Sequence, residues 1–151
     1  MAQLTDHFSD TEKGLQVLAT ADPRIVANAV FILQMLETVR AHYGTAVVVH
    51  DSYRPPAHNK AVGGKATSYH LFTGTQGAID FHVVGKSFPT VFDWIRLQSG
   101  LQFDKVIMES DPKTDQPDCI HIQADRNIKP RRQAYIGHSG AATSYLRVGV
   151  K

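Results

Sequence analysis

The sequence has almost no cysteine, since Cys119 is the only one among 151 residues. A single cysteine excludes a disulfide scaffold and a cysteine-rich zinc ribbon. Any metal ion must therefore be bound by histidine and carboxylate side chains. The chain also has no apolar run of membrane-spanning length, and it does not begin with a basic stretch followed by an apolar one. We therefore expect no membrane span and no signal peptide.

Strong charge of one sign is missing as well. The formal net charge is +2, and the densest basic cluster contains only Lys129, Arg131 and Arg132, which is too small to indicate a nucleic-acid partner. A content of 42% hydrophobic residues is ordinary for a globular protein, and 151 residues can bury one core. We expect a single domain over residues 1–151 that is a monomer.

Local signals predict one long helix followed by short strands. Asp22 and Pro23 are typical of a helix start, apolar residues then recur at helical spacing as far as Tyr43, and Gly44 is a typical C-cap. A short helix is expected after Ser87. Residues 52–67 read as loop, and the strands are expected at 47–49, 77–84, 103–109 and 119–123. The connection at 110–117 suits antiparallel pairing. This pattern predicts an α+β fold, with a small, mainly antiparallel sheet packed with helices.

Possible metal ligands stand at the edges of three predicted strands. They are His70, Asp80 and His121. Two histidines and a carboxylate suit a catalytic zinc ion, which takes three protein ligands and leaves one position for a water whose pKa falls to roughly 7. Spacing alone does not single these residues out, because the chain has 8 histidines.

Several short motifs occur in a characteristic order from residue 4 to about residue 135. They are Ser52-Tyr53-Arg54-Pro55, Asn59, Val62-Gly63-Gly64, Ser68-Tyr69-His70, Ala78-Ile79-Asp80 and Ile120-His121-Ile122. In this order the chain resembles the zinc D-Ala-D-Ala carboxypeptidases and L-alanyl-D-glutamate endopeptidases, particularly the single-domain branch of bacteriophage endolysins. The resemblance implies the fold shared by these DD-peptidases and hedgehog domains, and it implies Zn²⁺ bound by His70, Asp80 and His121.

The same resemblance suggests residues that contact the substrate. It implies that Arg54 grips a substrate carboxylate or steadies an oxyanion, as a rigid guanidinium can. The alternative is an arginine that simply pairs with Asp51. Ser52 and Ser68 are further substrate-binding candidates, and Ser68 could instead hydrogen-bond around His70.

Two acids are candidates for the catalytic base that takes a proton from water. Asp118 stands three residues before His121, which matches the acid-x-x-His arrangement of much of the family. Glu109 ends a strand expected to pair with that of His121, and an acid recurs there in the phage branch. Sequence reasoning favours Asp118 and leaves Glu109 open.

One departure from the family pattern lies between the first two ligands. Nine residues separate His70 from Asp80 where the family has six, and Gln76 replaces a glycine. We expect residues 71–77 to bulge around the Thr73-Gly74-Thr75 turn without moving either ligand.

The sequence thus predicts a zinc peptidase that cuts the stem peptide of peptidoglycan, of DD-carboxypeptidase or L-Ala-D-Glu endopeptidase type. The expected setting is a phage lysis protein, cytoplasmic until it is released to the periplasm or cell wall, or virion-associated. The alternative is a zinc-containing cell-wall-binding or structural protein with the same fold and no hydrolytic activity, which the insertion before Asp80 would favour.

Overall fold

The structure is a computed structural model that describes residues 1–16 and 22–151. Its strands form one six-stranded sheet in the order β1-β2-β4-β3-β5-β6. The strands are β1 (Val47–Asp51), β2 (Gln76–Val83), β3 (Lys105–Ser110), β4 (Pro117–Asp125), β5 (Gln133–His138) and β6 (Ala141–Val148). The helices are α1 (Pro23–Tyr43), α2 (Pro56–Ala61), α3 (Phe88–Leu97) and the 3₁₀ helix η2 (Tyr69–Leu71).

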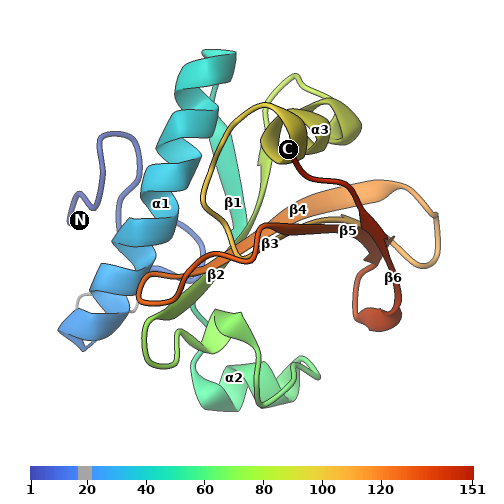
Figure 1. The fold of residues 1–151 in the computed structure, drawn as a ribbon. Coiled ribbons are helices and arrows are strands. Elements are labelled where there is room, and N and C mark those ends of the chain that lie inside the picture. The colour runs from blue at the N-terminus through green and yellow to red at the C-terminus, as the bar shows by residue number, and fades with distance from the viewer. Residues whose placement is uncertain (17–21) are drawn as a thin grey trace.

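The two faces of the sheet have different cover. Helices α1 and α3 pack against one face, whereas α2 and the loop around it lie on the other side (Figure 1). Neighbouring strands are antiparallel except for β3 and β5, which are parallel. We call the side under α1 and α3 the core face, and the opposite side the open face.

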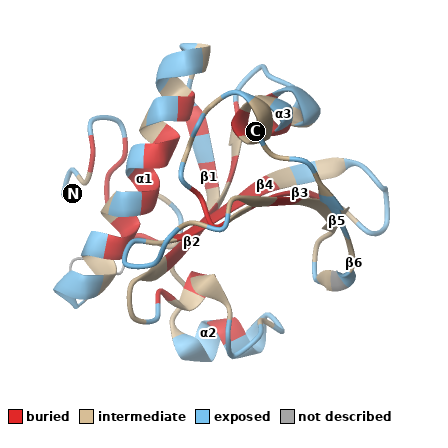
Figure 2. Cartoon of the chain, viewed as in Figure 1, coloured by how far each residue is buried: buried red, intermediate tan, exposed pale blue. Residues whose placement is uncertain are grey.

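Helix α1 is held in place by its ends and by one apolar side. The Asp22 side chain accepts a hydrogen bond from the backbone N–H of Arg24, and Pro23 occupies the first turn. Gly44 ends the helix at φ 66°, and its N–H donates to the carbonyl of Arg40 at 2.8 Å. The buried side of α1 faces the sheet (Figure 2). The helix expected from the sequence is confirmed at both ends.

Alternation along the strands divides side chains between the two faces. On β2, Ile79 and Phe81 are fully buried in the core, and on β4 Ile120 and Ile122 join them. Successive strand residues point to opposite sides. The residues between these four, Asp80 and His121 among them, therefore project from the open face.

The α+β fold and the mainly antiparallel sheet are confirmed. Four elements differ from the sequence prediction, and one of them is the 3₁₀ helix η2, which carries His70 where the edge of a strand was expected. Residues 56–61 form the short helix α2 where loop was expected, because Pro55 and Pro56 also suit a helix start. Strands β5 and β6 were missed, although Gly140 at φ 75° allows the tight turn between them. Among the described residues, no helix combines the length and apolarity needed to cross a bilayer.

Candidate active site

Strand register brings two of the expected ligands together. Asp80 on β2 is directly opposite His121 on the antiparallel strand β4, and side chains at such a pair stand close together on one face. Asp80 Oδ1 lies 2.8 Å from His121 Nδ1 and 3.3 Å from His70 Nε2. The ligand atoms of all three residues lie within 4.8 Å of one another. The structure therefore gathers His70, Asp80 and His121 into one cluster on the open face.

The backbone fixes the orientation of His70. Ser68 caps the one-turn helix η2, and its Oγ accepts the backbone N–H of His70 at 3.2 Å. The Nδ1 of His70 lies 2.7 Å from the carbonyl oxygen of Ser52. Because a carbonyl can only accept, Nδ1 carries a proton, and Nε2 is the ring nitrogen that faces Asp80.

The three groups at the centre of this cluster favour a positive charge between them. Burial alone would raise the pKa of Asp80, but the charge of His70 and hydrogen bonds from both histidines hold it far below its usual range. Burial alone would lower the pKa of His121, but its hydrogen bond with Asp80 and the charges of Asp80 and Glu109 raise it to about 9. A divalent cation can supply that positive charge, and two nitrogens with one carboxylate are a donor set that zinc accepts.

The two candidate bases lie in different surroundings. Glu109 is buried, and one of its carboxylate oxygens lies within 4.8 Å of an Asp80 oxygen. Burial raises the pKa of Glu109 although His121 opposes the shift, and Tyr145 Oη donates to Glu109 at 3.0 Å. Asp118 is exposed, and Ser139 Oγ donates to it at 3.3 Å.

A bulge re-aims the backbone at Asp118. Glu109 pairs with Cys119, but the next residue, Ser110, pairs with Pro117, so Asp118 is the extra residue on β4. The sequence spacing would place Asp118 and His121 on opposite faces of a regular strand. The bulge removes that restriction, and the acid-x-x-His spacing stays compatible with a role on the open face.

Arg54 is anchored so that part of its guanidinium remains available. Its Nε donates to Asp51 at 2.6 Å and its Nη1 to Asn59 Oδ1 at 3.3 Å, while its backbone N–H donates to the His70 carbonyl at 2.7 Å. Within residues 1–16 and 22–151, Nη2 makes no hydrogen bond. Gly64 permits this arrangement, because a Cβ there would lie 2.1 Å from Asn59 Oδ1.

The substrate contact expected of Ser52 does not fit its position. Ser52 is fully buried, and its hydroxyl donates to the Lys13 carbonyl at 2.7 Å. Gly14 packs so closely that a Cβ would lie 2.4 Å from Ser52 Oγ. The hydroxyl of Ser52 thus faces the amino-terminal segment. The carbonyl of the same residue orients His70. Ser68 caps η2, and it is the half-buried one of the two serines.

The insertion between His70 and Asp80 is tied down on both sides. From α1, Asn28 Nδ2 donates to the carbonyls of Phe72 and Gly74 at 3.2 and 2.9 Å. The hydroxyl of Thr75 donates to Asp125 at the end of β4. The chain turns over residues 72–75, a shorter span than the expected 71–77, because Leu71 belongs to η2 and Gln76 already belongs to β2; both ligands remain in the cluster.

Comparison with known families decides the relationship. The profile of the family peptidase M15 matches residues 1–111. The chain belongs to the peptidase M15 family. Members of this family are zinc-dependent metallopeptidases with peptidoglycan as the implied substrate. The match contains His70, Asp80, Arg54 and Glu109 and ends before His121. No curated protein matches the chain.

The candidate site contains polar residues to which sequence reasoning assigned no role. Gln123 hydrogen-bonds His121, Tyr145 hydrogen-bonds Glu109, and Asn59 supports Arg54. A signal existed for Gln123, which stands two residues after His121 and so shares its face of the strand. Tyr145 had no such signal, because it reaches Glu109 from a strand 36 residues further along the chain.

Proposed function

We propose that this chain is a zinc peptidase that hydrolyses a peptide bond in the stem peptide of peptidoglycan. One observation carries the proposal most strongly. His70 Nε2 and His121 Nδ1 both face Asp80 Oδ1, and the opposite nitrogen of each ring is engaged by a hydrogen-bond acceptor. The nitrogens that face Asp80 are thus the ones that a cation would bind in place of their hydrogen bonds to the carboxylate.

The residues that would hold zinc are His70, Asp80 and His121. When bound, zinc supplies Lewis-acid polarisation and lowers the pKa of water at the site to about 7. We assign general acid–base work to Glu109, because one of its carboxylate oxygens lies within 4.8 Å of an Asp80 oxygen and the side chain is shielded from solvent. Tyr145 fixes the Glu109 side chain from β6. Asp118 remains the competing assignment.

Arg54 would bind the substrate. Its Nε and Nη1 are held by Asp51 and Asn59, so the guanidinium plane is fixed before a substrate arrives. Its Nη2 can then donate to a carbonyl or carboxylate oxygen of the stem peptide without any loss of these contacts.

Replacing Arg54 by lysine tests that role. Arg54→Lys keeps the charge but loses the planar fork, so we expect kcat to fall about a hundredfold or more. The melting temperature should change little. Arg96→Lys is a matched control. Arg96 lies on α3, and it also donates from Nε to an aspartate three residues earlier, Asp93, and from Nη1 to a second oxygen, the carbonyl of Gly149. Near-normal turnover in Arg54→Lys would refute the role.

The activity itself is tested on purified peptidoglycan. We expect the zinc-loaded protein to release new amino and carboxyl termini within the stem peptide, identified by mass spectrometry, and chelator treatment to abolish them. The identity of the termini distinguishes a DD-carboxypeptidase from an L-Ala-D-Glu endopeptidase. Intact peptidoglycan after prolonged incubation with zinc-loaded protein would favour the alternative of a non-hydrolytic cell-wall-binding protein.

Two considerations bear on that alternative and on the biological setting. The insertion at 71–77 was its main support, but the insertion leaves His70 and Asp80 3.3 Å apart. The resemblance to phage endolysins supports a lysis protein that acts at the cell wall after release from the producing cell. Lysis timing in a host that expresses the chain with and without a membrane lesion would test this setting.

A further inference from the structure

A chain of hydrogen bonds starts at His121 and runs along the open face, away from the cluster of His70, Asp80 and His121. His121 Nε2 lies 2.8 Å from Gln123 Oε1, and Gln123 Nε2 donates to Asp104 Oδ2 at 2.8 Å. Arg131 donates to both oxygens of Asp104, from Nε at 2.6 Å and from Nη2 at 2.8 Å. We propose that Gln123, Asp104 and Arg131 form a positioning relay that fixes the tautomer and ring orientation of His121. The proposal rests on the zinc site proposed above.

In this relay, the hydrogen-bonding role of each residue determines which group of the next residue must donate or accept. The Arg131 guanidinium can only donate, so it requires an ionised Asp104. Burial opposes that ionisation, but the hydrogen bonds from Arg131 and Gln123 lower the pKa of Asp104. The ionised carboxylate can only accept, so Gln123 must turn its NH₂ group toward it. Its carbonyl oxygen then faces His121 and requires a proton on Nε2, so Nδ1, which lies 2.8 Å from Asp80 Oδ1, is the nitrogen that would bind the metal.

The burial of the relay strengthens this constraint. Gln123 and Asp104 are 8% and 6% exposed, so water offers little compensation for an inverted amide. The Arg131 side chain is 50% exposed, and it borders a cleft of about 280 Å³ that Tyr69 also lines. Tyr69 directly precedes the ligand His70. The relay therefore runs from the ligand cluster to solvent. Arg131, at the solvent end, can be replaced without opening a cavity.

The two histidine ligands are oriented by different means. His70 is held by a backbone carbonyl, which no side-chain substitution removes. His121 is held by a side chain that depends on two further side chains. We therefore expect zinc affinity to respond to changes at Gln123, Asp104 and Arg131, although none of them is one of the three residues that would hold the metal.

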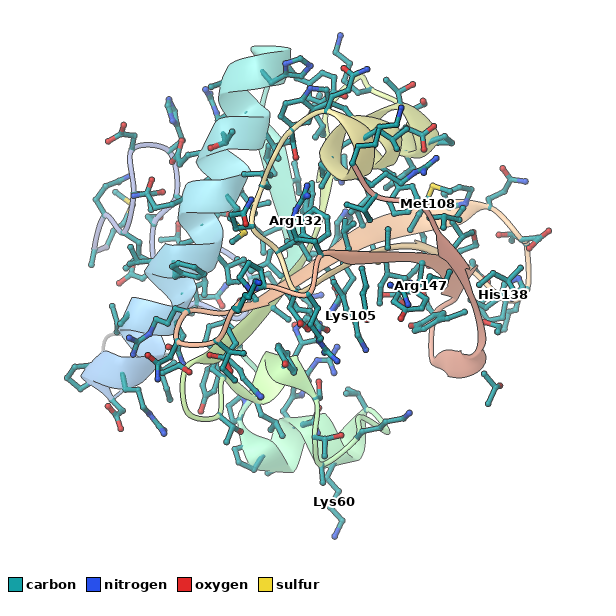
Figure 3. The ribbon with its side chains drawn as sticks, in the orientation of Figure 1. Lys60, Lys105, Met108, Arg132, His138 and Arg147 are labelled. Atoms are coloured by element: carbon teal, nitrogen blue, oxygen red, sulfur yellow. The ribbon has the colours of Figure 1, made fainter. Side chains whose placement is uncertain are left out.

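Zinc affinity of purified full-length variants, measured by competition with a chromogenic chelator, tests the relay. Gln123→Leu should weaken affinity about ten- to a hundredfold. Arg131→Lys should weaken it less, because lysine keeps the charge and loses the fork. Arg132→Lys is the matched control. Arg132 (Figure 3) bonds the carbonyls of Leu101 and Lys151, outside the relay, and zinc affinity should not change.

A swap of donor and acceptor separates positioning from simple packing. Gln123→Glu alone places a second carboxylate against Asp104, so it should weaken zinc affinity. Adding Asp104→Asn restores complementarity, since the new amide can donate to a carboxylate that still accepts from His121. We expect the double variant to recover about tenfold of the lost affinity. A residue that matters only for packing would show no such rescue, and its absence would overturn the relay.

A second readout does not depend on zinc. In long-range ¹H–¹⁵N spectra the parent protein should show a slowly exchanging His121 Nε2–H, and Gln123→Leu should lose it. Retention of that signal in Gln123→Leu, or equal zinc affinity in Arg131→Lys and Arg132→Lys, would overturn the relay. A parent protein that binds no zinc would instead count against the proposed zinc site. The His121 Nε2–H signal would still test the relay in that case.

Discussion

Replacing His121 by alanine is expected to reduce zinc content from about one ion per chain to near background. The residue supplies one of three ligands, and its removal leaves a histidine and a carboxylate, fewer protein ligands than catalytic zinc sites use. Peptidase activity should be lost with the metal. Zinc should also cease to raise the melting temperature, because a ligand stabilises a fold only when it binds. Metal analysis of the purified protein and melting with and without added zinc would measure these effects.

His138→Ala is a suitable control for this variant. The Nε2 of His138 lies 2.7 Å from Asp115, a contact similar in length to that of His121 with Asp80. His138 lies at the end of β5, well away from α2 and the loop that carries His70 (Figure 3). Its removal should leave zinc content and activity near parent values. Full zinc occupancy in His121→Ala would remove His121 from the site.

Glu109→Gln is expected to retain zinc and lose a hundredfold or more in kcat, the usual scale for removal of a general base. The glutamine keeps the shape and can still accept from Tyr145, so packing around the site should persist. Asp118→Asn should cost less than tenfold if the exposed acid only shapes the turn. Both variants should be assayed at matched zinc content, so that loss of metal does not imitate loss of the base.

The reverse result would reassign the base. An inactive Asp118→Asn beside an active Glu109→Gln would place proton transfer on the bulge of β4. Glu109 would then serve to hold the charge balance around Asp80. The sequence favoured Asp118 because of its spacing from His121, and the distances on the open face favour Glu109. The pair of variants decides between these two arguments.

Local sequence signals were sufficient for the elements whose ends carry capping residues. Helix α1 was predictable because Asp22, Pro23 and Gly44 act within a few residues of the structure they determine. Strands β5 and β6 were missed, because their polar and aromatic residues show no clean alternation and β5 is stabilised by parallel pairing with β3. Parallel pairing joins segments that are far apart in the chain, so no local pattern signals it.

For the candidate site, too, local sequence signals predicted one part and long-range pairing determines the other. The sequence order suggested His70, Asp80 and His121, but their proximity depends on the pairing of Asp80 with His121, 41 residues apart. The contact from Asp104 through Gln123 to His121 depends on the same register. A shift of one residue would turn every one of these side chains to the core face. Residue types were therefore predictable where a motif names them, and the geometry was not.

The three ligands differ in how firmly the fold holds them. Asp80 and His121 lie on adjacent strands in the middle of the sheet, whereas His70 belongs to a single 3₁₀ turn at Tyr69–Leu71. Local opening of a single turn outside the sheet costs less free energy than disruption of central strands. Dissociation of a bound ion would therefore begin when this turn opens and His70 no longer coordinates it. The rate at which a chelator strips the protein should follow the fraying of that turn and not the unfolding of the sheet.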